Sequence, residues 1–597
     1  MRLGMIRPLL VIAMAPAGCG GVNDADDGDA GTVDAGPSAA LLSSLALGDL
    51  ELDPPFDPAV TEYTTVAPFH LDDIAVTAAA PAEHFISVAE SAVDSGVPSD
   101  PIALNLGPNV IAVEVQSFGR DTTTYLISVS RGLESLGYIK ASNAEEVDQF
   151  GFAVAISGDV LAIGAPGEKS ASTGINADQN DNSSSNAGAV YIFVKTGGVW
   201  VQEAYIKPLV IDLNDAFGRQ LALDGDTLVV GSSVEDSAAI GVNGDANNNA
   251  AVTSGAAWVF VRSQAGTWTQ QAYLKASNTA SADTFADSVA ISGNTIAVGA
   301  IGEDSAADGI GGNQLDNGAA SAGAVYIYHR VNGVWSQQAY IKASTSGATD
   351  LFGQSVALDG DTLVVGADGE DSNATGVNGN EAIDTEASAG AAYVFVRAGV
   401  AWSQQAYLKA SNTQAGDVLG RSVSISGDTV VISAEGEDSG ASEVNGNQAD
   451  NGQPSAGAAY VFTRSSGIWS QEAYLKASNA AASDNFSTQV VVEGDVIAVT
   501  ALAEDSAAQG FDGNQADNNA ANAGSAYIFR RVDGQWRQTN YLKATVADSL
   551  DNFGVACSLS GGRLVVGSRL EDSAAQAIDG DANDNTATAA GAAYVFE

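Results

Sequence analysis

Histidine and cysteine are the scarcest reactive side chains in this sequence. Its 597 residues include three histidines and two cysteines. His70, His84 and His329 fall in unrelated sequence contexts, so neither a zinc site nor a Ser-His-Asp triad has a plausible set of members. Cys19 and Cys557 are too few and too far apart to suggest a disulfide framework. Paired carboxylates occur throughout, so no single pair indicates a glycosidase. We therefore expect a protein that is not an enzyme.

Basic residues are also few. Lysine and arginine number 24 against 73 aspartates and glutamates, which gives a formal net charge of −49. Such a surface repels nucleic acid and anionic lipid, so we expect neither as a partner. It attracts cations and suits a solvated extracellular protein. No stretch approaches the roughly 20 apolar residues of a membrane-spanning helix. Contact with a membrane is expected only through a lipid anchor.

The first 19 residues have the features of an export signal. Arg2 and Arg7 precede a short apolar run at 9–15, and small residues follow. Ala17-Gly18-Cys19 resembles the end of a bacterial lipobox, which implies cleavage and lipidation at Cys19. A lipoprotein at the bacterial cell surface or outer membrane is therefore expected, with ordinary secretion as the alternative. Residues 20–40 are acidic and glycine-rich, without apolar periodicity, and predict a flexible tether.

A unit of 67 or 68 residues recurs seven times between residue 136 and the C-terminus. Its landmark is an apolar residue, usually phenylalanine, two positions after an aspartate. We expect these aspartates at the start of the innermost strands, around the mouth of a central channel. They are Asp148, Asp215, Asp283, Asp350, Asp417, Asp484 and Asp551.

Each repeat contains four β segments. In the copy that starts at Phe352 they are 354–358, 362–366, 391–397 and 402–409, and a two-residue turn containing glycine joins the first two. Four-stranded units repeated seven times predict an all-β, seven-bladed β-propeller over residues 136–597. Residues 138–140 carry a fourth-strand signature before any first strand, and the chain ends on a third strand. The N-terminal strand should therefore complete the last blade. The recurring tryptophans are expected to pack between adjacent blades or over an outer strand.

Two resemblances follow from these motifs. Phe150-Gly151 together with Gly164-Ala165-Pro166 resembles the FG-GAP repeat of integrin α-subunit propellers. The resemblance implies a propeller that binds or adheres to an extracellular protein or glycan. The integrin calcium hairpin cannot be carried over, because the turns between first and second strands are too short. Residues 41–131 alternate short β runs with Pro, Gly and Asp turns. Within them, the runs LGPNVIAVEV at 106–115 and TTTYLISVSR at 122–131 resemble a cadherin-like β-sandwich domain.

The second-to-third connections are about 20 residues long, too long to be mere connectors. Strand parity places them on one face, together with the fourth-to-first connections. Most begin with a Glu-Asp pair, and the first copy has Glu168-Lys169 instead. The pairs expected on this face are Glu235-Asp236, Glu303-Asp304, Glu370-Asp371, Glu437-Asp438, Glu504-Asp505 and Glu571-Asp572.

Clusters of Asp and Asn continue these loops and leave two interpretations open. Such oxygens suit calcium, which takes six to eight of them, although no copy has a full EF-hand loop. Alternatively, the side chains form Asx-turns and the Glu-Asp pairs form a solvated rim. The landmark aspartates have the same two alternatives, a shared ion or bonds to loop amides. The candidate calcium ligands are Asn176, Asp178, Asn180, Asp512, Asn514, Asp517, Asp579, Asp581, Asn583, Asp584 and Asn585.

These observations predict an exported, non-enzymatic binding or adhesion module that presents acidic loops to a protein or glycan. One alternative is a structural envelope protein without a specific ligand. Another is a propeller enzyme acting on polysaccharide, which would need charged residues unique to one blade. No blade shows such a set, although Arg219, Arg421 and Arg569 break the repeat.

Overall fold

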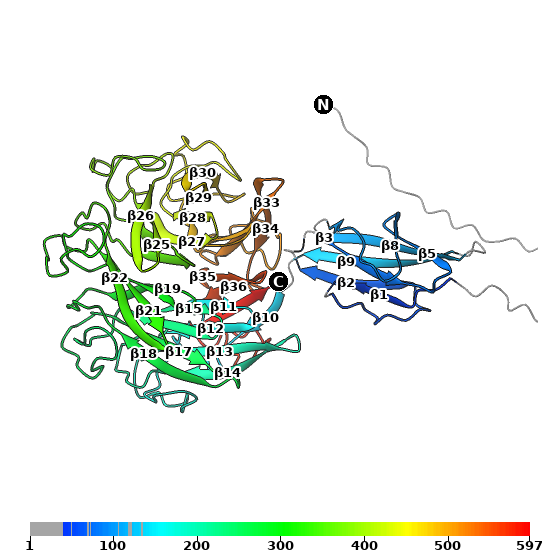
Figure 1. Ribbon diagram of the computed structural model, residues 1–597. Coiled ribbons are helices and arrows are strands. Elements are labelled where there is room, and N and C mark those ends of the chain that lie inside the picture. Colours follow the sequence, from blue (N-terminus) through cyan, green and yellow to red (C-terminus); the bar gives the residue numbers. More distant parts are fainter. Residues whose placement is uncertain are drawn as a thin grey trace, which may run out of the picture. The chain divides into compact units, whose positions relative to one another are not determined.

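The computed structural model consists of β-strands and loops, without a helix in the part of the chain that it describes (Figure 1). Accordingly, no helix there could cross a membrane. The predicted export signal, Cys19 and all of the predicted tether except residue 40 lie outside the described residues. The structure describes residues 40–48, 50–68, 71, 73–104, 107–117, 122–132 and 135–597.

The chain forms two compact units. The first comprises residues up to Thr65, Asp73–Ala103 and Val110–Val129. The second comprises Val66–Asp72, Leu104–Asn109 and Ser130–Glu597.

The strands of the N-terminal region form one five-stranded and two two-stranded sheets. In β9, buried Tyr125, Ile127 and Val129 alternate with exposed residues, so one face of the larger sheet packs on a core. Tyr63 is also buried, and its hydroxyl donates to the carbonyl of Asp57 at 2.7 Å. The larger sheet has the order β2 (Glu62–Pro68), β9 (Thr122–Gly132), β8 (Gly107–Ser117), β5 (His84–Val88), β6 (Ser91–Val93). The smaller sheets pair β1 (Ser44–Leu47) with β4 (Val76–Ala79) and β3 (Asp73–Ile74) with β7 (Ile102–Ala103).

The second unit contains seven four-stranded antiparallel sheets, which we call blades 1 to 7. Blade 1 is β11 (Ala153–Ser157), β12 (Val160–Ala165), β13 (Ala189–Thr196), β14 (Val199–Ile206); blade 2 is β15 (Gln220–Asp224), β16 (Thr227–Ser232), β17 (Ala256–Arg262), β18 (Trp268–Leu274). Blade 3 is β19 (Phe285–Ser292), β20 (Thr295–Ala300), β21 (Ala324–Val331), β22 (Val334–Ile341); blade 4 is β23 (Ser355–Asp359), β24 (Thr362–Ala367), β25 (Ala391–Ala398), β26 (Ala401–Leu408). Blade 5 is β27 (Leu419–Ser426), β28 (Thr429–Ala434), β29 (Ala458–Ser465), β30 (Ile468–Leu475); blade 6 is β31 (Phe486–Glu493), β32 (Val496–Ala501), β33 (Ser525–Val532), β34 (Gln535–Leu542). Blade 7 is β35 (Phe553–Ser560), β36 (Arg563–Ser568), β37 (Ala592–Phe596) and β10 (Ser135–Ile139).

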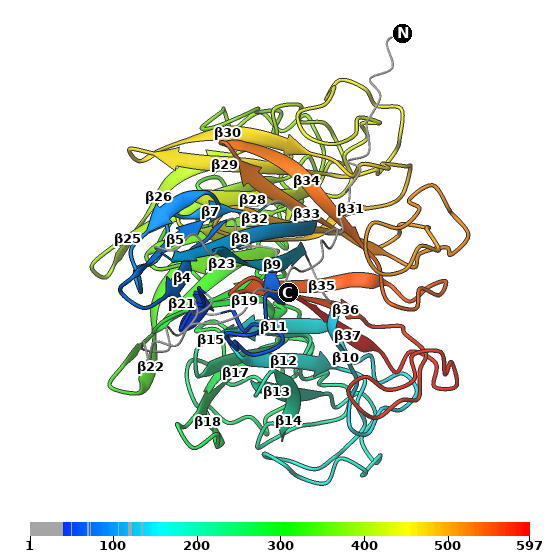
Figure 2. The same cartoon turned by 90° about the vertical axis from the view of Figure 1, so that its right-hand side faces the viewer.

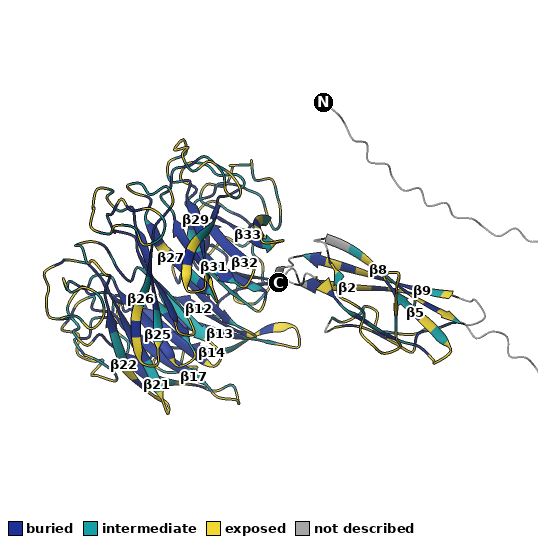
Figure 3. Cartoon of the chain, turned by 45° about the horizontal axis from the view of Figure 1, so that its top comes forward, coloured by how far each residue is buried: buried dark blue, intermediate teal, exposed yellow. Residues whose placement is uncertain are grey.

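The first strands of neighbouring blades contact one another all the way round, from β11 through β35 and back to β11. They are therefore the innermost strands of a closed ring, as a seven-bladed propeller requires. In Figure 3 the strands are mostly buried, whereas the loops carry most of the exposed residues. The predicted fold class is confirmed.

The N-terminal strand of the propeller closes the ring, as predicted. β10 pairs antiparallel with β37, with Tyr138 opposite Tyr594 (Figure 2). Beside this joint, Phe150 and Gly591 form a parallel bridge between blades 1 and 7. Gly591 has a φ of +82°, and a Cβ there would lie 2.0 Å from the carbonyl oxygen of Phe150. Only glycine fits this close approach.

The two-residue turns between first and second strands join each blade to the next. The side chain before each turn glycine accepts a hydrogen bond from the backbone N–H of the turn glycine in the following blade. The bond from Gly158 to Ser560, at 3.2 Å, crosses the closure. The pairs are Gly158–Ser560, Gly225–Ser157, Gly293–Asp224, Gly360–Ser292, Gly427–Asp359, Gly494–Ser426 and Gly561–Glu493.

The tryptophans pack between blades, as predicted. Trp335 is 3% exposed, and its indole N–H donates to Gln271 of the preceding blade at 2.7 Å. Trp268, Trp402 and Trp469 each donate in the same way to a Glu or Gln one blade back. We call the side with the two-residue turns the hairpin face, and the side with the second-to-third connections the loop face.

Candidate functional site

The glutamates of the Glu-Asp pairs lie in the interior, which corrects the expectation of a solvated rim. Glu370 is 4% exposed and binds Lys409 Nζ through Oε2 at 2.8 Å, while its Oε1 accepts the Tyr407 hydroxyl at 2.8 Å. Burial lowers the pKa of the lysine, and the neighbouring glutamate opposes that shift. A charge pair in the core tolerates burial only with such complete partnering.

All seven blades contain this ion pair. Glu168, which the sequence set apart from the other copies, occupies the same position and binds Lys207 at 2.9 Å. In blade 7 the lysine comes from the segment just after β10, so the pair also links the two ends of the ring. The pairs are Lys207–Glu168, Lys275–Glu235, Lys342–Glu303, Lys409–Glu370, Lys476–Glu437, Lys543–Glu504 and Lys140–Glu571.

The aspartates of the pairs close the long loops. Asp304 Oδ1 accepts the backbone N–H of Ser321 at 2.8 Å, and so ties the start of the loop to its end. The other five make the equivalent bond. They are Asp236 to Thr253, Asp371 to Ser388, Asp438 to Ser455, Asp505 to Asn522 and Asp572 to Ala589.

The landmark aspartates are buried at the start of each blade. Asp350 Oδ2 accepts the backbone N–H of Gly347 at 2.7 Å. Burial, together with the charges of Glu370 and Asp371, raises the pKa of Asp350 to about 6 against the opposing effect of the bond from Gly347. Asp148, which also contacts Lys169, has a pKa of about 6, and the other five have a pKa of about 7. All seven make the bond to a loop amide three residues earlier, the contact expected of the loop-amide alternative.

Some of the candidate calcium ligands tie the loops to the fourth strands. Asn176 Oδ1 accepts the N–H of Tyr205 at 2.9 Å, and Asp512 Oδ1 accepts that of Tyr541 at 2.8 Å. Asp579 makes the same bond across the ring closure, to Tyr138 at 3.0 Å.

Others form local turns. Asp178 and Asp581 accept the N–H of Asn180 and Asn583, two residues on, and Asn514 accepts that of Ala516. Asp517 accepts from Asn519, and Asp584 accepts from Thr586. Asn585 makes no local turn and instead donates to Asp548, which precedes the first strand of the same blade. In the described ranges, no three or more His, Cys, Asp or Glu residues form a group that could hold a metal ion.

Two positions at the channel mouth differ from blade to blade. One lies two residues after the landmark apolar residue, and the other directly follows the second strand. Both fall at the loop-face ends of the two inner strands. The first set is Phe152, Arg219, Asp287, Gln354, Arg421, Thr488 and Val555; the second is Pro166, Ser233, Ile301, Asp368, Glu435, Leu502 and Arg569. The sequence shows that the three arginines break the repeat, but their shared location at the channel mouth was not predicted. The constant offset from the landmark could have shown it.

The mouth has a cationic sector over blades 7, 1 and 2. Arg219 Cζ and Arg569 Cζ each lie 5.4 Å from the ring centroid of Phe152. Burial lowers the pKa of Arg569, and the charge of Arg219 lowers it further. Arg569 Nε is buried without a hydrogen-bond partner in the described part of the chain.

The sector over blades 3 to 5 has a different charge pattern. Arg421 pairs there with Asp368 at 3.2 Å and with Glu435 at 2.9 Å. Burial raises the pKa of Asp287. A hydrogen bond with Ser233 and the charges of Arg219 and Arg421 oppose that rise. The carboxylates in this sector outnumber its one arginine, so the mouth is polarised.

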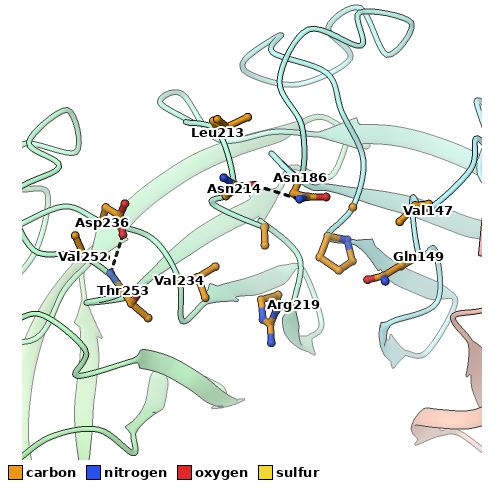
Figure 4. A pocket seen from close by; sticks show the side chains of 13 residues that line it. Val147, Gln149, Asn186, Leu213, Asn214, Arg219, Val234, Asp236, Val252 and Thr253 are labelled. Atoms are coloured by element: carbon orange, nitrogen blue, oxygen red, sulfur yellow. Dashed lines mark hydrogen bonds between the residues drawn. The ribbon is translucent and has the colours of Figure 1, made fainter.

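A groove of about 610 Å³ opens on the loop face of blades 1 and 2 (Figure 4). Val147, Leu213 and Val252 line it and are 48%, 60% and 61% exposed. Arg219 lies among the lining side chains, near Val234. Asp236 also lines the groove, but its carboxylate accepts the N–H of Thr253. The groove therefore combines aliphatic side chains and one guanidinium with polar side chains, namely Gln149, Asn186, Asn214, Asp236 and Thr253.

Comparisons with solved structures give only distant similarity. A hypothetical selenium-binding protein from Sulfolobus tokodaii is 9% identical with a TM-score of 0.26, covering 67% of this chain and 85% of that one. A quinonprotein alcohol dehydrogenase-like protein from Bacteroides thetaiotaomicron is 8% identical with a TM-score of 0.23, covering 83% and 99%. A protein of the Bacteroides ovatus mixed-linkage glucan utilization locus, in complex with a heptasaccharide, is 11% identical with a TM-score of 0.10, covering 50% and 71%. None of these carries an argument about function.

No curated protein matches the chain. The family model for a cadherin-like beta sandwich domain matches residues 42–132. The model for the FG-GAP repeat matches residues 136–193, 200–260, 268–328, 335–395, 402–462, 469–529 and 536–596. Since these repeats cover well over half of the sequence, the chain belongs to the FG-GAP repeat family and carries a cadherin-like β-sandwich domain before its propeller.

Proposed function

We propose that this protein is an exported, non-enzymatic module that binds an extracellular protein or glycan through the loop face of its propeller. The FG-GAP repeats and the cadherin-like domain together suggest an extracellular binding or adhesion module. Fold alone does not establish a ligand. The proposal therefore depends on the distribution of repeated and unrepeated residues on this face.

One observation carries the proposal: the repeated residues hold the loops, whereas the unrepeated residues gather at the channel mouth. Glu370, Asp371 and Asp350, with their equivalents, are occupied by ion pairs and loop amides. They hold the long loops in place and leave few side-chain groups free for a ligand. The chemically diverse side chains gather at the channel mouth of the same face. Varied residues on a rigid scaffold are typical of a binding surface.

Catalysis has less support than binding. Of the unrepeated carboxylates at the mouth, Asp368 and Glu435 are both engaged by Arg421, and Asp287 bonds to Ser233. A general acid and base acting on a sugar would need two carboxyl groups free to face the substrate. The proposal does not depend on calcium, because Asx-turns and strand contacts already close the loops.

Export and anchoring belong to the same proposal. We expect the chain to be anchored through lipid on Cys19 at the bacterial cell surface or outer membrane. Replacing Cys19 by serine should move the protein from the membrane fraction to the soluble fraction, as measured by immunoblotting. Mass spectrometry of the wild-type N-terminus should find the lipid, and an unmodified Cys19 in the membrane fraction would contradict the anchor.

The binding function can be tested by charging one face at a time. Leu315 and Ile240 are 83% and 61% exposed on the loop face, while Val334 and Ile468 are 69% and 73% exposed on the hairpin face. Residues 20–597 would be screened against glycans and purified extracellular proteins, and each ligand found would be titrated. We expect Leu315→Glu/Ile240→Glu to weaken binding about tenfold by introducing charge at the interface.

The matched control is Val334→Glu/Ile468→Glu, which adds the same charge on the hairpin face and should leave the affinity unchanged. Equal effects of the two double variants would contradict the assignment of the face. A screen that finds no ligand would favour a structural envelope protein.

A further inference from the structure

We propose that the groove over blades 1 and 2, together with the neighbouring Arg219 and Arg569, binds an acidic peptide segment of a partner protein. The segment would place a carboxylate against the two guanidiniums and aliphatic side chains along the groove. This inference rests on the proposed binding function and names the chemistry of the ligand.

The proposal depends first on the charge of Arg219 and Arg569. With a net charge of −49, this chain offers a carboxylate to most of its basic residues. Examples are Arg262 with Glu203 and Arg464 with Asp428. In the described part of the chain, no ion pair joins Arg219 or Arg569 to a carboxylate.

The two guanidiniums also act on each other. Burial lowers the pKa of Arg569, and repulsion by Arg219 lowers it further; among the described residues its buried Nε has no hydrogen-bond partner. The charge of Arg219 lowers the pKa of Asp287, but the Asp287 carboxyl group forms its hydrogen bond with Ser233. An incoming carboxylate would relieve the repulsion, and guanidinium groups bind carboxylates in a bidentate manner.

The proposal depends second on the side chains that line the groove. Val147, Leu213 and Val252 are large apolar side chains that remain about half exposed or more. They gather around one groove, and apolar side chains that cluster in this way mark an interaction site. The residues that line the groove include no aromatic ring on which a sugar could stack, and the neighbouring Phe152 ring lies under the two guanidiniums. Aliphatic side chains beside an arginine, with amide groups such as Asn186 and Asn214 that can bond a peptide backbone, therefore fit an acidic peptide with Val or Leu side chains better than an acidic glycan.

The charges of the sector over blades 3 to 5 orient the ligand. Asp368 and Glu435 lie there with Arg421, and Asp368 Oδ1 is buried without a hydrogen-bond partner in the described ranges. A carboxylate ligand is repelled from that sector and drawn to the sector of Arg219 and Arg569. One end of the mouth therefore accepts the acidic group.

The experiment uses labelled peptides of Asp and Val in a Gly-Ser background, with Asn-for-Asp and Lys-for-Asp peptides of equal length. Fluorescence anisotropy would measure their affinity for residues 20–597 at low salt, about 50 mM, and at higher salt. We expect the Asp peptide to bind about tenfold more tightly than the Asn peptide, and more weakly as salt rises. Arg219→Gln/Arg569→Gln should weaken binding about tenfold or more.

Arg397→Gln/Arg464→Gln is the matched control. It removes two positive charges that pair with Asp361 and Asp428 away from the mouth. Binding should be unchanged in this variant. Thermal unfolding of each variant checks that the propeller is intact, and Leu213→Glu tests the apolar wall without touching an arginine.

Three outcomes would overturn the inference. They are equal binding of the Asp and Asn peptides, an unchanged affinity in Arg219→Gln/Arg569→Gln, and Arg-dependent binding of oligogalacturonate in place of the peptides. If charging the loop face abolished binding of another ligand while the arginine variant did not, the proposed function would stand and this inference would fall.

Discussion

At the scale of the residue, the most regular polar feature of this propeller is a buried ion pair in every blade. Seven Lys–Glu pairs lie in the interior, each at the junction of a fourth strand and a long loop. Both partners recur visibly in the sequence. Their pairing could not be predicted, because they are far apart in the chain and charged residues are ordinarily exposed. Only the folded blade brings them together.

Removing one partner of a pair should be costly. Lys409→Met would leave the buried Glu370 carboxylate uncompensated, and we expect a loss of about 3–5 kcal/mol in unfolding free energy. Denaturant unfolding measures it. Lys409→Met/Glu370→Met should recover much of that loss, since neither charge then remains buried. Lys195→Met, at a more exposed pair with Glu597, is the control and should cost far less. A loss no larger than that of the control would contradict the role of the buried pair.

The landmark aspartates predict a dependence of stability on pH. Burial raises the pKa of Asp417 to about 7 in the folded protein, from an ordinary value of 3.8. The folded state therefore binds more protons than the unfolded state between these values, so stability falls as pH rises. The contribution is complete below pH 3.8 and is lost as pH passes through about 7. Asp215, Asp283, Asp484 and Asp551 act in the same direction.

Unfolding free energy measured from pH 4 to pH 8 should decline, and Asp417→Asn should make the decline shallower. The amide keeps an oxygen that can accept the N–H of Gln414, so the loop contact can survive the substitution. A decline just as steep in Asp417→Asn would contradict the raised pKa.

At the scale of the element, the blade was largely predictable from the sequence. The strands expected at 354–358, 362–366, 391–397 and 402–409 lie within about a residue of β23 to β26 at either end. Period-two alternation and glycine turns suffice for that. The contacts of the loops were not predictable, because Asp and Asn serve equally well as calcium ligands, as Asx-turn acceptors or as solvated side chains.

Glycine at the blade junction gives a direct test of packing. Gly591→Ala places a Cβ 2.0 Å from the carbonyl oxygen of Phe150 and should destabilise the protein by roughly 3 kcal/mol or more. Gly333→Ala is matched in backbone conformation, with a φ of +80° against +82°, but has no atom within 4 Å of the added carbon. It should cost only about 1 kcal/mol. Similar losses in denaturant unfolding would show that the junction is not tightly packed.

The loops make a prediction about calcium. Asp581, Asp512 and Asp579 already accept backbone N–H groups, so their oxygens are engaged without an ion. We expect the unfolding temperature to be the same after chelation and after calcium addition, at matched ionic strength. A saturable rise specific to calcium, absent with magnesium, would instead assign these loops as ion sites.

At the scale of the whole molecule, the strictly repeated residues build the propeller, and the residues that differ between blades gather at the channel mouth. The ring closure was predicted, because a lone fourth strand at one end and a missing one at the other can satisfy each other. The polarised mouth was not predicted. Its residues come from all seven blades, and single arginines such as Arg219 look like random departures until the ring brings them together.

The most direct test is a hydrogen-exchange footprint of the bound ligand. Amide exchange of residues 20–597 would be followed with and without a saturating ligand, whether an identified partner or the Asp peptide. We expect slower exchange on the loop face, in segments 147–152, 213–219 and 566–572. Slower exchange confined to the hairpin turns at 157–160 and 224–227 would contradict the central claim that the propeller binds through its loop-face mouth.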